Sequence, residues 1–338
     1  MCAVYLDILF KIVINLELNE MLKIMKMTKC LVTGGAGFIG SHIIENLLNL
    51  GHEVVCLDNF DAYYSPQLKG KNIEPFMKNA RFKLVEGDIR DKALLNRTLD
   101  GVEYVFHEAA QAGVRISVED PMKPHEINAT GTLNLLESVL DSDVRKVINA
   151  SSSSVYGRVE YLPFDEDHPN QPVSPYGVSK LLAEHYCRVF EELYGLKSVS
   201  LRYFTVYGPR MRPDLAINIF TKAALKNEPI TIFGDGKKTR DFTYVDDIVR
   251  ANLVCMEKGS GVYNIGAGNS ISINDLARKI IEINGSKSEI VYSDSVKGDA
   301  EHTLASSEKA LKELAWKPEI TVEEGLERYA KWMSNSQS

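Results

Sequence analysis

The chain has 338 residues, of which 44% are hydrophobic and 25% charged, so it can bury a full core and exceeds the usual length of one domain. Its formal net charge of −7 excludes a general positive field that would attract nucleic acid or an anionic membrane surface. The five cysteines have no CxxC spacing and fall in apolar patterns, which predicts reduced core thiols in a cytoplasmic protein.

The first 26 residues precede a segment, 27–30, that resembles an ordinary enzyme start. They are apolar, but they carry charges from Asp7 to Glu20 and lack a basic leader and a small-residue cleavage site. The stretch therefore predicts neither a signal peptide nor a membrane span. We expect residues 1–26 to be an extension that arises from an upstream start codon; an appendage packed on the domain is the alternative.

From residue 29 onward, short β-branched runs alternate with longer segments of helical apolar spacing. The predicted strands are Cys30–Thr33, Val54–Asp58, Phe82–Glu86, Tyr104–His107, Val147–Ala150 and Val199–Phe204. The predicted helices include Ile39–Leu50, Asn128–Leu140 and Val178–Tyr194. This alternation predicts an α/β fold with a doubly wound parallel sheet covered on both faces.

The alternation weakens after about residue 205, where Pro, Gly and charged residues become denser. We therefore expect two interleaved domains. The cofactor domain spans 27–204 plus about 241–268. A smaller C-terminal α/β substrate domain spans about 205–240 plus 269–338, and the ligand lies between the two.

The first predicted strand runs directly into Gly34-Gly35-Ala36-Gly37-Phe38-Ile39-Gly40 and then a helix. Gly34 permits a tight turn, Gly37 lets backbone N–H groups approach a pyrophosphate, and Gly40 lets the helix pack on the strand. Three glycines at this place can also be only a tight connection. We include Phe38 and Ile39 in the predicted cofactor site.

An acidic residue completes the dinucleotide pattern. Asp58 falls 24 residues after Gly34, at the end of the second strand, where a carboxylate can accept hydrogen bonds from ribose hydroxyls and repels a 2′-phosphate. The sequence therefore predicts a Rossmann-type domain that binds NAD, with Asn59 beside Asp58. Asp88 and Ile89 follow the third strand and either receive the adenine or, in the case of Asp88, cap the helix that begins at Lys92.

Serine, tyrosine and lysine follow in the order that proton transfer requires. Ser152 ends the fifth strand, and Tyr176 lies 24 residues later with Lys180 four residues beyond it on one helix face. A nearby cation can help a phenol with a pKa of about 10 to act as a base at neutral pH. Either pattern alone occurs by chance, but together, after a nucleotide-binding motif, they indicate catalysis.

Residues 29 to about 333 resemble the NAD-dependent epimerase/dehydratase family of extended short-chain dehydrogenases/reductases, and within it the UDP-sugar 4-epimerases. The matching motifs are GGAGFIG, LDNF, GDIRD, HEAAQAG, SSSSVYG, YGVSK, LRYFTVYGPR and RDFTYVDD. The resemblance implies that Tyr176 takes the proton of the sugar C4 hydroxyl while hydride passes to NAD⁺. The 4-keto sugar then turns over and receives the hydride on its other face.

The resemblance also implies ligand contacts. Those for the cofactor are Glu108, Ala109, Ala110, Gln111, Asn128 and Tyr203, besides Tyr176 and Lys180. Those for the UDP-sugar are Ser152, Ser154, Thr205, Arg212, Thr231, Phe233, Arg240 and Thr303. Arg240 would clamp the diphosphate, because its planar fork suits phosphate oxygens; an ion pair with Asp241 or Asp246 is the alternative. Val296 stands where the family often has Arg, so a second phosphate clamp is either missing or replaced by Lys297.

The sugar is left open by conflicting motifs. Sister dehydratases and decarboxylases have acids where this chain has Ser153 and Ser154, so the reaction is expected to stop at epimerisation. A small residue at Thr303 leaves room for an acetamido group, and our first choice is UDP-GlcNAc/UDP-GalNAc, with or without UDP-Glc/UDP-Gal. UDP-glucuronate is the runner-up, with Arg212 as the carboxylate partner.

Three further expectations concern class and partners. A nucleotide-binding regulator without catalysis is the alternative to an enzyme, but such a module needs none of the proton transfer that Ser152, Tyr176 and Lys180 provide. Family resemblance suggests a homodimer through the helices Asn128–Leu140 and Val178–Tyr194. The seven histidines are scattered and His107 is expected to be packed, so no metal site is expected.

Overall fold

A computed structural model of the protein describes residues 27–294 and 301–337. The predictions for residues 1–26 and for Val296 and Lys297 lie outside the described residues. The four cysteines at positions 30, 56, 187 and 255 are buried and free. None of the described helices is long and apolar enough to cross a membrane.

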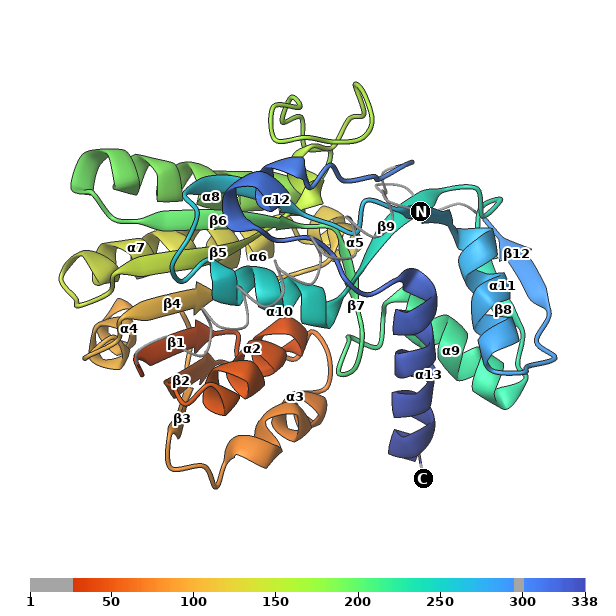
Figure 1. Ribbon diagram of the computed structural model, residues 1–338, viewed down its shortest axis with the longest axis horizontal. Helices are drawn as coiled ribbons and strands as arrows, with labels where there is room; N and C mark the ends of the chain where they lie inside the picture. The colour runs from red at the N-terminus through yellow and green to blue at the C-terminus, as the bar shows by residue number, and fades with distance from the viewer. Residues whose placement is uncertain (1–26, 295–300, 338) are drawn as a thin grey trace, which may run out of the picture.

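The main element is a parallel sheet of seven strands in the order β10-β6-β5-β4-β1-β2-β3 (Figure 1). Its strands are β1 (Lys29–Thr33), β2 (Glu53–Asp58), β3 (Phe82–Glu86), β4 (Tyr104–His107), β5 (Lys146–Ser152), β6 (Ser198–Tyr203) and β10 (Gly261–Ile265). All six predicted strands are present, with ends shifted by no more than two residues. The doubly wound α/β prediction is confirmed.

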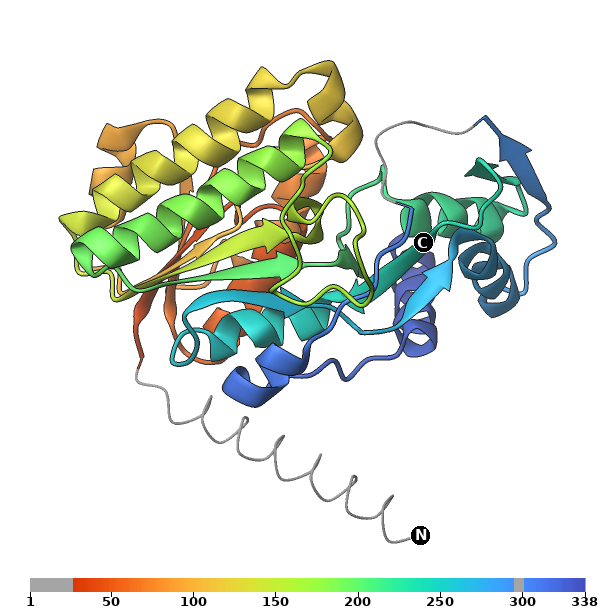
Figure 2. The same cartoon turned by 90° about the horizontal axis from the view of Figure 1, so that it is seen from above.

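Helices cover both faces of this sheet. The helices and turns of this part are α2 (Phe38–Asn49), α3 (Pro66–Ile73), the 3₁₀ turn Glu74–Phe76, α4 (Lys92–Thr98), α5 (Val114–Glu119), α6 (Met122–Pro124), the π-helical turn His125–Thr130, α7 (Gly131–Leu140), the 3₁₀ turn Ser153–Val155, α8 (Pro175–Tyr194), α10 (Val245–Val254) and α12 (Glu308–Leu314). Figure 2 shows α7 and α8 together over one face, and α2 packs with α10 on the other.

The core follows from the pleat of the parallel strands. In β1, Cys30 and Val32 pack in the cluster that includes α2, whereas Leu31 between them packs in the cluster that includes α7. Successive side chains of a strand point to opposite faces, so a sheet covered on both sides has apolar residues throughout. Continuous apolar runs in the sequence are therefore the correct signal for this sheet.

Two predicted helices start three residues earlier than their apolar spacing indicated. The helix expected from Asn128 begins with the π-helical turn at His125 and continues into α7. The helix expected from Val178 begins at Pro175, because the Ser174 hydroxyl caps it by accepting from the Gly177 N–H at 3.1 Å and proline suits the first turn. Tyr176 therefore lies in the first turn of α8, one helical turn before Lys180.

A smaller lobe lies beyond the carboxyl ends of the sheet strands (right of Figure 1). It contains a three-stranded sheet in the order β11-β9-β7 and a parallel pair β12-β8. Its elements are β7 (Thr205–Tyr207), α9 (Ala216–Lys226), β8 (Ile230–Phe233), β9 (Thr239–Tyr244), β11 (Ser270–Ser272), α11 (Ile273–Ile283), β12 (Ile290–Ser293) and α13 (Val322–Gln337). The chain returns to the large sheet through α10 and β10, and the proposed domain limits stay a prediction.

Candidate active site

The glycines between β1 and α2 leave little room for a side chain. Gly34 has a φ of +66°, and a Cβ there would lie 2.7 Å from the backbone of Ala109. A Cβ on Gly40 would lie 2.4 Å from the carbonyl oxygen of Gly34. Only glycine fits these two positions. The first residues of α2, whose N–H groups have no partner within the helix, line a cavity. This cradle fits the pyrophosphate of a dinucleotide.

Substituting Gly40 tests this cradle. In the Gly40→Ala variant, a methyl group meets backbone rather than a side chain that can move, so α2 must shift from β1. We expect a loss of about 1–3 kcal/mol in the free energy of unfolding, measured in urea, and weaker NAD binding, measured by calorimetry. Gly70→Ala on α3 is the matched control, since its Cβ meets nothing within 4 Å. Equal NAD affinity in the two variants would contradict the cradle.

The acidic residue after β2 lies where the motif predicts. Asp58 is buried at the cavity wall and accepts backbone N–H bonds from Ala36 at 3.0 Å and Phe60 at 2.8 Å. Burial raises the pKa of this carboxyl, while Lys69 and the two backbone donors lower it. Each oxygen keeps a further lone pair for a ribose hydroxyl.

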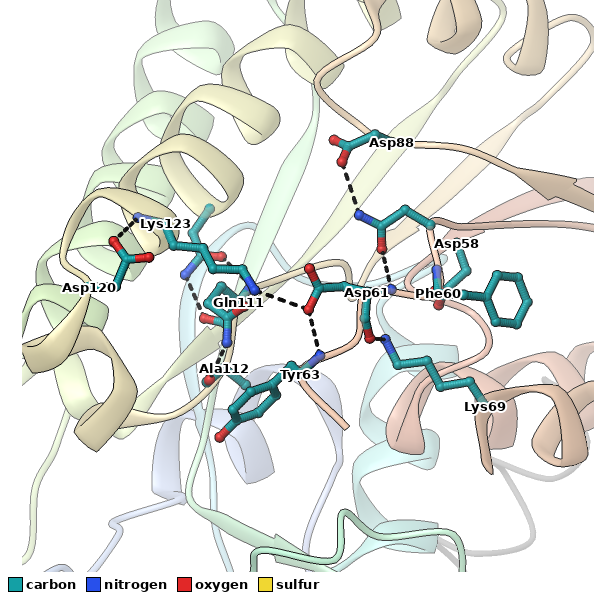
Figure 3. A network of polar contacts seen from close by, with 12 residues as sticks. Asp58, Phe60, Asp61, Tyr63, Lys69, Asp88, Gln111, Ala112, Asp120 and Lys123 are labelled. Carbon is teal, nitrogen blue, oxygen red and sulfur yellow. Dashed lines mark hydrogen bonds and ion pairs between the residues drawn. The ribbon is translucent and has the colours of Figure 1, made fainter. Parts of the chain in front are cut away.

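Figure 3 shows how the loop after β2 is joined to the end of β3. Asn59 donates to Asp88 at 2.9 Å, and Arg90 binds the same carboxylate and holds its pKa down at about 2. The capping role considered for Asp88 is wrong, because Asp91 directly precedes α4 and accepts from the Leu94 N–H at 3.0 Å. Asp88 instead lines the cavity.

One cavity of about 320 Å³ collects nearly all predicted cofactor residues. Its walls include Gly34, Gly37, Phe38, Ile39, Gly40, Asp58, Asn59, Asp88, Ile89, Glu108, Ala109, Ala110, Gln111, Ser152, Tyr176, Lys180 and Tyr203. Asn128 is the exception. It lies buried behind Gln111, accepts from the Gln111 N–H at 2.7 Å and donates to the Ser179 hydroxyl at 2.9 Å, so it supports the wall instead of lining it.

The three predicted catalytic side chains converge on this cavity from β5 and α8. Ser152 ends β5, and its hydroxyl accepts from the Ser154 N–H at 3.1 Å. Tyr176 and Lys180 project from the first two turns of α8. The ammonium of Lys180 donates to the Ala150 carbonyl at 2.6 Å, which ties α8 to β5.

The phenol of Tyr176 is more weakly acidic here than the sequence argument assumed. Burial raises its pKa, the interaction with Ser152 and the positive charge of Arg212 lower it, and Glu108 raises it. Burial also lowers the pKa of Lys180. Ser152 and Arg212, and not Lys180 as expected, therefore lower the pKa of Tyr176. A positively charged nicotinamide would lower this pKa further.

Glu108 is the acidic member of this group. It follows β4, accepts from the Tyr203 hydroxyl at 2.8 Å, and that hydroxyl accepts from Asn252 at 2.7 Å. Burial raises the pKa of Glu108, and Lys180 and Tyr203 lower it. The pair of Glu108 and Lys180 thus places one acid and one base in the cofactor cavity, each influencing the charge state of the other.

The Glu108→Gln variant is expected to shift the acidic limb of the kcat profile to lower pH. The carboxylate raises the pKa of Tyr176, so its removal lets the phenol ionise at lower pH. Initial rates between pH 5 and 10 measure this shift. Tyr203→Phe removes the hydrogen bond but keeps the charge and should move the limb less. A limb that stays in place in Glu108→Gln would refute the electrostatic role.

A second cavity of about 800 Å³ adjoins the first, and Tyr63, Tyr176 and Arg212 line both. It collects the other predicted substrate residues, namely Ser154, Thr205, Thr231, Phe233, Arg240 and Thr303. Ile230 and Ile232 of β8 are buried, whereas Thr231 and Phe233 alternate with them and face the cavity. This alternation gives the lobe its packed side and its ligand side.

Arg240 was predicted to bind the diphosphate or, as the alternative, to form an ion pair with Asp241 or Asp246. Asp241 accepts N–H bonds from Ala267, Gly268 and Ala305, and Asp246 pairs with Arg328 at 3.3 Å. Both carboxylates thus have partners of their own. Thr303 is buried, its hydroxyl accepts from the Asp241 N–H at 3.1 Å, and this small side chain lines the second cavity.

Several residues that line the cavities were not predicted from the sequence. Tyr63 and Asp214 line the substrate cavity, and Arg115 of α5 lies with its Cζ 5.5 Å from the ring centre of Phe233. A pair of tyrosines in a polar loop after Asp58 was the available signal for Tyr63.

His107 is packed as expected, with its ring nitrogens 2.8 Å from the Thr33 hydroxyl and 2.9 Å from the Thr132 hydroxyl. Within 27–294 and 301–337, no group of three or more His, Cys, Asp or Glu could hold a metal.

Comparison with known proteins gives the family. The family described as GDP-mannose 4,6 dehydratase matches residues 31–329. A putative UDP-glucose 4-epimerase of Methanocaldococcus jannaschii is 42% identical, over 90% of this chain and 98% of its own. A UDP-glucuronate 4-epimerase of Thermodesulfobacterium geofontis is also 42% identical, over 89% and 95%.

A solved structure is also similar to this chain over most of its length. The UDP-glucuronic acid 4-epimerase from Bacillus cereus, crystallised with UDP-glucuronic acid and NAD, is 38% identical with a TM-score of 0.87, over 91% of this chain and 100% of its own. The chain belongs to the NAD-dependent epimerase/dehydratase family.

Proposed function

We propose that this protein is an NAD-dependent UDP-sugar 4-epimerase and that its substrate is UDP-glucuronate. The observation that carries the choice of sugar is Arg212. Its guanidinium lines both cavities beside Tyr176, and its charge acts on the phenol. A cation at the meeting point of the cofactor and substrate cavities suits a sugar that bears a carboxylate close to the reacting carbon.

The reaction is proton and hydride exchange at C4. NAD held by the glycine turn, Asp58 and Lys180 would supply the hydride acceptor and donor for C4. Tyr176 takes the proton of the C4 hydroxyl when the sugar is oxidised and returns it to the C4 oxygen when the 4-keto sugar is reduced, so no proton or electron pair is consumed. Ser152, at the end of β5, interacts with the Tyr176 hydroxyl and would hydrogen-bond the same sugar oxygen. Lys180 holds α8 against the strand. The inverted sugar follows when the 4-keto sugar presents its other face.

Elimination after the oxidation is disfavoured by the residues beside Ser152. Ser153 and Ser154 line the substrate cavity where a dehydratase needs acidic groups. Without a carboxylic acid at these positions, no side chain there carries a proton to a departing hydroxyl. The 4-keto sugar therefore has hydride return as its available route.

The nucleotide end of the substrate is assigned to β8 and β9. Phe233 offers an exposed ring for stacking on uracil, and Thr231 faces the same cavity. Arg240, on the neighbouring wall, is assigned to the diphosphate, whose oxygens match its planar donors. These roles follow from the resemblance and from the lining of the cavity.

A second candidate is UDP-GlcNAc, our first choice from the sequence, with UDP-glucose beside it. The small Thr303 side chain favours it, because it leaves volume beside the sugar C2 substituent. The relatives are divided between glucose and glucuronate in their names. Arg212 supports the acidic sugar, since a neutral sugar needs no such cation.

NMR of the protein incubated separately with UDP-glucuronate, UDP-GlcNAc and UDP-glucose tests the assignment. We expect the anomeric signal of UDP-galacturonate from the first, and a clear rate advantage over the other two. Exclusive production of UDP-GalNAc would overturn the choice of UDP-glucuronate. Tight binding of NAD and UDP-sugars with no turnover of any would support the regulator alternative.

A homodimer through α7 and α8 is part of this proposal. Leu140 on α7 and Val178, Leu193 and Tyr194 on α8 are exposed apolar residues. Covering them in a partner would follow the pairing of the family. A light-scattering mass of one chain at micromolar concentration would remove the dimer.

A further inference from the structure

Arg212, on which the choice of UDP-glucuronate rests, already has a carboxylate partner in this chain. Its Nε and Nη2 atoms donate to the two carboxylate oxygens of Asp214 at 3.0 and 3.1 Å. Two such bonds between one guanidinium and one carboxylate form a strong, geometrically defined pair. A protein carboxylate therefore already holds the Nε/Nη2 edge of Arg212, where a second carboxylate can pair only by displacing it.

Tyr63 is the third member of this group. Its hydroxyl donates to Asp214 at 3.1 Å, and its ring centre lies 5.5 Å from the guanidinium carbon of Arg212. The loop that carries Tyr63 is fixed from the cofactor side (Figure 3), because Asp61 accepts the Tyr63 N–H at 2.8 Å and pairs with Lys123 at 3.1 Å. The ring can thus stay beside the guanidinium whichever carboxylate the guanidinium holds.

The exposure of the two charged partners differs in a way that decides which one moves. The Arg212 side chain is 20% exposed, whereas that of Asp214 is 45% exposed. A half-exposed carboxylate regains water when it leaves the pair, but a largely buried guanidinium needs an anionic partner at all times. Exchange of the partner is consequently cheaper than withdrawal of the arginine.

We propose that Asp214 is a resident counter-ion of Arg212 which the substrate carboxylate displaces, with Tyr63 retaining the guanidinium during the exchange. This inference rests on the proposed action on UDP-glucuronate. One carboxylate replaces another, so the charge around Arg212 is unchanged and no covalent bond is altered. A neutral sugar leaves the pair intact. Asp214 is then a specificity-determining residue, because its competition sets how strongly the site prefers acidic over neutral sugars.

The test compares KM values for UDP-glucuronate and UDP-glucose in Asp214→Asn, which removes the charge at nearly constant size. We expect the ratio of KM for UDP-glucuronate to KM for UDP-glucose to fall about threefold to tenfold, the equivalent of a partly exposed ion pair. Tyr63→Phe, which only frees Asp214 of one donor, should lower the ratio less. Glu323→Gln is the control, since its carboxylate is 55% exposed and pairs with Lys279 at 2.6 Å on another surface.

A different change in the KM ratio would overturn the inference. A ratio that rises in Asp214→Asn means that Asp214 holds Arg212 ready for the substrate, and an unchanged ratio means that the two carboxylates do not compete; both overturn the inference. A wild-type protein without turnover of UDP-glucuronate overturns the proposed substrate itself, and this result is read before any variant. Thermal midpoints verify folding, and Asp214→Ser provides a second charge-removing variant.

Discussion

The Tyr176→Phe variant is expected to lose about 10²–10⁴-fold in kcat while still binding NAD, because it removes the proton-transfer group and leaves the ring that lines both cavities. Turnover followed by NMR of the product measures the first effect, and calorimetric titration with NAD measures the second. The two readings together separate a chemical role from a binding role.

Tyr161→Phe is the matched control for this variant. Its hydroxyl is bonded to Asp165 at 2.7 Å in the exposed loop after β5, away from both cavities. We expect wild-type kcat from it. Retained kcat in Tyr176→Phe would refute the assigned acid/base, whereas loss of NAD binding in the same variant would mean that the phenol shapes the cofactor site instead.

The large sheet could be predicted because each of its strands is encoded locally. A parallel strand buried on both faces needs a short apolar, β-branched run. Val147–Ala150 is such a run, and with Lys146 before it and serines after it, it is too short for a buried helix. Chain order then fixes which strand ends meet at one edge. That is why Gly34, Asp58 and Ser152 could be assigned to one site from sequence order alone.

Contacts between distant segments could not be predicted in the same way. Asp88 and Asp91 are both plausible helix caps by composition, and only the position of the first helical residue and the bonds of Asp88 to Asn59 and Arg90 decide between them. The pairing of Tyr63 with Asp214 joins residues 151 positions apart. No local periodicity reports such a contact, although each partner has an ordinary polar loop sequence.

The same limit applies to the buried ion pair behind the catalytic strand. Glu184 of α8 accepts from Arg202 of β6 at 2.9 and 2.8 Å, and both side chains are less than 5% exposed. Ser151 also donates to Glu184, and the guanidinium lies 4.7 Å from the ring centre of Tyr156. The sequence showed Arg202 only as part of a strand motif, because its partner belongs to a different element.

Breaking this pair gives the second large effect expected of a single substitution. The Glu184→Gln variant leaves the guanidinium of Arg202 buried without an anion, which is expected to cost about 3–5 kcal/mol of the free energy of unfolding in urea. Glu192→Gln is the control on the same helix. It breaks an exposed pair with Arg188 and should cost about 0.5 kcal/mol or less. Similar losses in the two variants would contradict the buried pair as a structural element.

Removing both charges separates stability from positioning. In Glu184→Leu combined with Arg202→Met, no charge remains unpaired, so stability should return to within about 1–2 kcal/mol of the wild type. The Ser151 hydroxyl, however, still loses the carboxylate that it binds, directly before Ser152 at the end of β5. We therefore expect the double variant to fold and to bind NAD with unchanged affinity, but to have a lower kcat than the wild type. Full recovery of kcat would mean that the pair only fills the core, because the orientation of the catalytic strand end would then not depend on it.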